Sequence, residues 1–206
     1  MGSLSGWLYR MCEWITRLVY VNLLWIGFSL IGLLLFGIGP ATSSMFTVIR
    51  KWVRGQEDIN VFSTFRKTYK KDFWKANLLS FLLIVGGCLL YIDFLFIGQL
   101  EGAVMSLLSG LLLLLTMLYI VIVLYVFPVF VHFELKPWQS IKYAIHLGVS
   151  SPLSMLIIVA SLLLMYYVTV YIPAIIPFFS GSIVSFIIMY RADISLRKLE
   201  TKYIPT

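Results

Sequence analysis

The sequence predicts an all-α fold, a polytopic bundle of about five transmembrane helices with two amphipathic interfacial helices. Of its 206 residues, 61% are hydrophobic and only 12% are charged, and its mean hydropathy is +0.96. A soluble domain typically carries about 25% charged residues. Half that density leaves too few charges to cover a water-facing surface, so lipid must solvate much of the chain. The length suits one integral membrane domain over residues 1–206.

Five stretches are apolar enough to be spans. A helix needs roughly 20 apolar residues to cross about 30 Å of hydrocarbon. The predicted spans are residues 18–38, 76–97, 103–127, 153–171 and 177–190. The first ends at Gly39-Pro40, which we expect to be a structural corner, and Pro128 is placed to kink the third. The fifth is short, so a re-entrant or tilted segment is the alternative for it.

A basic amphipathic helix is predicted between the first two spans, over residues 61–75. At 100° per residue, one narrow face is aromatic and carries Phe62, Phe65, Tyr69 and Phe73. The adjoining surface is basic and carries Arg66, Lys67, Lys70, Lys71 and Lys75. The pattern is typical of a helix in the membrane interface that faces lipid or a partner. A helix packed onto other helices by its aromatic face fits the pattern equally well.

A second helix of this kind is predicted at residues 137–151, where Pro137 suits the first turn. Its apolar positions are Trp138, Ile141, Ile145 and Val149, and they repeat the aromatic spacing at a constant offset of 76 residues, from Phe62 to Trp138 onward. A span that ends at a proline precedes each helix. This shared order favours an internal duplication with halves 18–97 and 103–171. The alternative is that the same physics shaped two unrelated interfacial helices.

The distribution of charge predicts the topology. Half of the 16 Lys and Arg residues lie between residues 50 and 75, and four more lie between residues 191 and 202. Basic loops stay on the cytoplasmic side, so we expect these loops and the C-terminus there, in the cell membrane. Pairing of spans then puts the N-terminus outside, although Arg10 and Arg17 favour the inside. A model with residues 40–54 as an extra half-span satisfies both arginines, but that stretch is short and ends in basic residues.

No catalytic, cofactor-binding or metal-binding residues are predicted. The sequence lacks the motifs GxSxG, HExxH, GxxxxGK[ST] and CxxC. His132, Glu134 and His146 could share one face as a metal site, but their spacing favours interfacial polar residues. Asp93 is the acidic residue closest to a span interior, which makes it a weak candidate for an intramembrane ionisable site.

Two consecutive segments carry a family resemblance. GPATSSMFTVIRKWVRGQED (39–58) and VFSTFRKTYKKDFWKANLL (61–79) resemble the YesL-like family of bacterial integral membrane proteins of unknown function. The resemblance implies an association with ABC-type importers of polysaccharide fragments, and it brings no catalytic residues with it. We therefore expect a non-enzymatic accessory to a carbohydrate (oligosaccharide) ABC importer. Its partners would be the lipid bilayer and the permease subunits, not nucleic acid. A small secondary transporter or permease is the alternative function.

Overall fold

The computed structural model describes the backbone of residues 2–98 and 102–203, and side chains from 6–98 and 105–197. Within these ranges all regular structure is helical, and five helices are long and apolar enough to cross a membrane. This confirms the predicted fold class and number of spans. The elements are α1 (Gly2–Ile31), α2 (Ile38–Val53), α3 (Val61–Ile97), α4 (Gly102–Phe133), α5 (Pro137–Ser150), α6 (Pro152–Tyr171), the 3₁₀ helix η1 (Pro173–Ile175) and α7 (Ile176–Tyr203).

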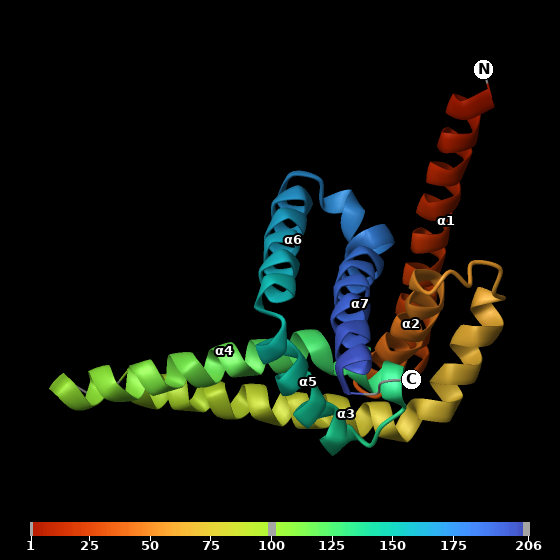
Figure 1. Ribbon diagram of the computed structural model, residues 1–206. Coiled ribbons are helices and arrows are strands. Elements are labelled where there is room, and N and C mark those ends of the chain that lie inside the picture. Colours follow the sequence, from red (N-terminus) through yellow and green to blue (C-terminus); the bar gives the residue numbers. More distant parts are fainter. Residues whose placement is uncertain (1, 99–101, 204–206) are drawn as a thin grey trace.

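Figure 1 shows a long hairpin, a shorter hairpin and a buried helix where they meet. α3 and α4 run side by side as an arm on the left of the view, and α6 and α7 form the second hairpin. The arm lies across the direction of α6 and α7, so the spans do not share one axis. α2 packs against α1, α3, α4 and α7, and ten of its 16 residues are buried. The charged groups of the candidate functional site lie around this helix.

The first span ends earlier than predicted. α1 stops at Ile31, and residues 32–37 reverse the chain in a compact turn. Gly32 and Gly37 make this turn tight, since a Cβ on Gly32 would lie 2.3 Å from Cα of Gly37. The predicted end at residue 38 is wrong because the apolar run continues through the turn, where Leu33 and Leu35 are 80% and 76% exposed. Hydropathy alone therefore does not mark the turn.

α2 returns alongside α1 as an antiparallel partner. Trp25 Nε1 donates a hydrogen bond to Thr42 Oγ1 at 3.0 Å, and the rings of Trp14 and Trp52 lie 5.9 Å apart. Beyond them, Arg17 Nη1 is 3.1 Å from Glu57 Oε2. The early part of α1 thus lies on the same side as loop 54–60. α2 returns beside α1 as in the half-span alternative, and the side of the membrane on which the N-terminus lies stays a prediction.

The basic helix and the second span form one continuous element, α3. Asn60 caps its start by accepting a hydrogen bond from the Ser63 N–H at 2.9 Å. Phe65 is fully buried, and Phe28 of α1 packs on Phe65 and Tyr69 with ring centroids 5.1 and 5.0 Å apart. The aromatic face is therefore packed against another helix, as the second interpretation of this pattern expected.

α5 begins at Pro137 as predicted, but it buries a different face. Gly148 allows α5 to lie directly on α4, since a Cβ there would be 2.0 Å from Val121 Cγ1. Trp138 and Val149 instead point outward, 64% and 71% exposed. At the corresponding positions of α3, Phe62 is also exposed, at 45%, whereas Phe73 is partly buried against the core. The segment after Pro128 also continues α4, whereas its counterpart in the first half is the separate helix α2, and the internal duplication stays a prediction.

Candidate functional site

The basic helix predicted from the sequence forms the first part of α3 and presents its cations outward. All five side chains are exposed: Arg66, Lys67, Lys70, Lys71 and Lys75. We call these five residues the basic face. Because the buried aromatic rings anchor the other side of the same turns, the direction of the basic face is fixed by packing in the core.

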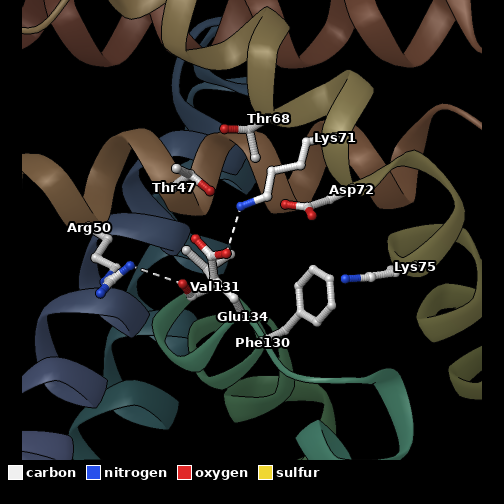
Figure 2. A pocket seen from close by; sticks show the side chains of 9 residues that line it. All are labelled: Thr47, Arg50, Thr68, Lys71, Asp72, Lys75, Phe130, Val131 and Glu134. Atoms are coloured by element: carbon white, nitrogen blue, oxygen red, sulfur yellow. Dashed lines mark hydrogen bonds and ion pairs between the residues drawn. The ribbon is translucent and has the colours of Figure 1, made fainter.

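A small polar cavity lies beside the basic face, among α2, α3 and the end of α4 (Figure 2). Its volume is about 60 Å³. α2 supplies Thr47 and Arg50, α3 supplies Thr68, Lys71, Asp72 and Lys75, and the end of α4 supplies Phe130, Val131 and the following Glu134. We call it the α2–α3–α4 cavity. Three cations and two carboxylates therefore share a space of a few water molecules.

Two polar contacts organise the α2–α3–α4 cavity. Lys71 Nζ donates to Glu134 Oε2 at 2.6 Å, and Arg50 Nη1 donates to the Val131 carbonyl at 3.0 Å. Glu134 adopts a φ of 50°, the left-handed conformation that often ends helices. The hydrogen bond from Lys71, together with its charge, holds the pKa of Glu134 below its ordinary value. Both carboxylate and ammonium are charged near neutral pH, and the pair ties α3 to the end of α4.

A second charged cluster, not among the predicted site residues, centres on Asp193 of α7. Its side chain is 3% exposed and is held by Arg54 at 3.1 Å and Arg197 at 2.7 Å. Arg54 Nη2 also lies 3.4 Å from both ring nitrogens of His132. A buried carboxylate requires such partners. The cluster joins the end of α2 to α4 and α7, so its arrangement is that of a structural clamp.

The alternative of a metal site formed by His132, Glu134 and His146 is not seen in the structure. Among the residues whose side chains the structure describes, no three His, Cys, Asp or Glu groups lie close enough to hold a metal ion. His132 is buried and faces Arg54, whereas His146 is exposed on α5. Glu134 pairs with Lys71. The three side chains therefore lie in separate environments.

The remaining predicted positions lie apart from the α2–α3–α4 cavity. Gly39 and Pro40 are buried in the first turn of α2, where a Cβ on Gly39 would be 2.8 Å from the Ala76 carbonyl oxygen. They permit close packing of α2 on α3, and the reversal of the chain comes just before them. Asp93 is exposed on α3, in the last turns before Ile97.

Asn22 is a polar site that sequence reasoning missed. Its side chain is fully buried; Nδ2 donates to the Pro177 carbonyl at 2.8 Å, and Oδ1 accepts from the backbone N–H groups of Gly181 and Ser182, both at 3.1 Å. All of its hydrogen bonds go to the backbone of α7. The asparagine therefore joins two spans and needs no ligand to explain it.

Comparison with known proteins places this chain in a family without an assigned activity. The family model described as "Protein of unknown function, DUF624" matches residues 18–94. Three proteins of Bacillus subtilis (strain 168) are similar over nearly the whole chain. YteU is 38% identical over 97% of this chain and 89% of its own length. YesL is 32% identical over 97% and 94% of the two chains, and YesV is 31% identical over 95% and 94%.

The chain belongs to the YesL-like, DUF624 family. All three relatives of this family bear the description "uncharacterized", and no solved structure matches the chain. The YesL-like family model covers α1 from residue 18 through most of α3, including the basic face and the α2 and α3 walls of the cavity. Glu134 and Asp193 lie beyond it.

Proposed function

We propose that this YesL-like protein is a non-enzymatic accessory protein of the plasma membrane that binds the permease subunits of a carbohydrate ABC importer. The observation that carries the proposal is the two-sided construction of α3. Phe65 is fully buried, while Arg66, Lys67 and Lys70 are exposed on the same turns. A rigidly held row of cations next to a membrane span is a surface for an acidic partner.

The permease subunits are the partner class for two reasons. The basic face precedes the apolar part of α3 directly, so a partner must reach it at the membrane surface. A polytopic protein with acidic loops at that level meets this condition and can also contact the apolar arm. The family resemblance noted above points to ABC-type importers, and the charge asymmetry predicts that the basic face lies on the cytoplasmic side.

The interior polar groups favour a binding protein over a transporter. A transport pathway requires polar or charged groups that converge on a passage near mid-depth. Asn22 instead bonds to the backbone of α7, and Asp193 pairs with Arg54 and with Arg197 of its own helix. A groove of about 490 Å³ between α3 and α4 is large enough for a small solute, but apolar side chains such as Phe94, Leu112 and Met117 line most of it. That lining suits lipid chains better than a sugar.

Affinity purification in nanodiscs from the native host, grown on a complex polysaccharide, tests the proposal. We expect stoichiometric co-purification of ABC permease subunits, abolished by Lys67→Glu with Lys70→Glu. Lys71 stays unchanged because it is bonded to Glu134. Lys136→Glu with Lys142→Glu is the matched control, since both lysines are exposed outside α3 and the charge change is equal. Recovery of the protein alone, as one monodisperse species, would contradict stable docking; solute flux into proteoliposomes, abolished by Asp93→Asn, would then support the transporter alternative.

A further inference from the structure

The α2–α3–α4 cavity has the size of a single oxyanion. One water molecule needs a cavity of roughly 15 Å³, and this cavity has a volume of about 60 Å³. A phosphate group, with four oxygens around one phosphorus, fills a space of that order. A hexose ring, with more than twice as many non-hydrogen atoms, does not fit.

The lining has the chemistry that phosphate requires. Arg50, Lys71 and Lys75 provide cationic N–H donors from two helices, and Thr47 and Thr68 add hydroxyl donors. Arginine and lysine are the side chains that bind phosphate most often. Asp72 and Glu134 line the same space and reduce its net charge to +1 from these five ionised groups. One of those carboxylates, Glu134, accepts a hydrogen bond from the Lys71 ammonium, as Figure 2 shows.

Two exposed tryptophans close in sequence to lining residues favour a cavity at the depth of the lipid headgroups. Trp74, next to the lining residues on α3, is 82% exposed, and Trp138 at the start of α5 is 64% exposed. Exposed tryptophans collect at the membrane–water interface. Basic pockets between membrane helices at this level bind lipid headgroups.

We propose that the α2–α3–α4 cavity is a phosphate-binding site, whose ligand is either the phosphate ester of a membrane lipid or free inorganic phosphate. Arg50, Lys71 and Lys75 bind the phosphate oxygens, and the two threonine hydroxyls donate to them. Lys71 exchanges Glu134 for the ligand, because the Lys71–Glu134 pair is largely exposed and exposed pairs are weak. This inference uses Lys71 and Lys75, which line the cavity, whereas the test of the docking proposal uses Lys67 and Lys70, so either proposal can fail alone.

Native mass spectrometry of the full chain in detergent measures the site directly. The probes are phosphatidylglycerol, a diacylglycerol of the same chains without phosphate, and inorganic phosphate with sulfate as its competitor. We expect Lys71→Gln with Lys75→Gln to weaken phosphatidylglycerol binding about tenfold, the effect of losing a charge-assisted hydrogen bond. Lys67→Gln with Lys70→Gln removes the same charge from the same helix outside the cavity, and we expect a change below about twofold.

Glu134→Gln provides an independent test of phosphate binding if the double variant fails to fold. Removing the competing carboxylate should strengthen phosphate binding roughly threefold or more, a gain that misfolding does not produce. Binding of the lipid without displacement by inorganic phosphate identifies a headgroup site, and tight binding of inorganic phosphate itself identifies a free-anion site. Equal effects of the two lysine pairs, equal binding of diacylglycerol, or weaker binding by Glu134→Gln would each overturn the proposal.

Discussion

The Asn22 side chain of α1 hydrogen-bonds to the backbone of α7 at Gly181, where the absence of a side chain leaves room for it. The Gly181 N–H donates to Asn22 Oδ1 at 3.1 Å, and a Cβ on residue 181 would lie 2.9 Å from that same oxygen. The glycine is thus required for the close approach of the amide. Since water is absent from the hydrocarbon region, α7 depends on this side chain to satisfy backbone groups in its early turns.

Asn22→Leu should destabilise the protein by about 1–3 kcal/mol, because it leaves backbone groups of α7 without their interhelical partner. Thermal unfolding in detergent measures the effect. Leu23→Ala is the control, since Leu23 is 47% exposed on the same helix and its loss should change the melting temperature little. An unchanged melting temperature for Asn22→Leu would show that the amide is not needed for the packing of α1 on α7.

Asp193→Asn should be more destabilising than the loss of either arginine partner alone. Its carboxylate is shared by Arg54 and Arg197, so one substitution removes both ion pairs, while Arg197→Gln leaves the pair with Arg54. The arginines are 33% and 58% exposed, which limits the expected cost to about 1–3 kcal/mol. Chemical or thermal unfolding of the unsubstituted protein, Asp193→Asn and Arg197→Gln gives the order of their stabilities. A larger loss for Arg197→Gln than for Asp193→Asn would contradict the shared clamp.

The sequence predicted those features that depend on local pattern. Few charges and long apolar runs were enough for the helical membrane fold and its five spans, and the spacing around Phe65 was enough for the basic face. The end of α1 was missed because Leu33 and Leu35 keep the turn apolar. α2 was not predicted as a separate helix because Gly39-Pro40 looks like a break, whereas proline fits a first helical turn that needs no N–H donor.

The polar contacts between helices could not be predicted from the sequence, for a different reason. Asn22 and Gly181 are 159 residues apart, and Arg54 and Asp193 are 139 residues apart. No local periodicity connects such positions, and the partner decides whether a polar side chain in a span is structural or functional. Asp193 left one weak signal, an acid four residues before Arg197 on the same helix face. The Lys71–Glu134 contact likewise required the fold to bring α3 to the end of α4.

Gly148→Ala should separate α5 from α4. The added methyl group would meet Val121 Cγ1 at 2.0 Å, a clash that a β-branched side chain in a packed helix cannot relieve easily, and the expected cost is about 1–3 kcal/mol. Val121→Ala should restore part of the loss in the double variant. Gly110→Ala is the matched control, because nothing lies within 4 Å of its added methyl and helix propensity alone favours alanine. Equal effects of the two glycine substitutions would contradict close packing at Gly148.

Labelling with a membrane-impermeant maleimide tests the relative placement of the N-terminal region and loop 54–60. Cys12 is exposed and lies five residues before Arg17, which bonds to Glu57 in loop 54–60. Cys12 and a cysteine introduced by Gln56→Cys should therefore react from the same side of oriented vesicles. Each is studied alone, in a Cys88→Ser background, with Cys12→Ser added for the loop variant. Reaction from opposite sides would mean that α2 does not return beside α1, and that residues 18–53 cross the membrane only once.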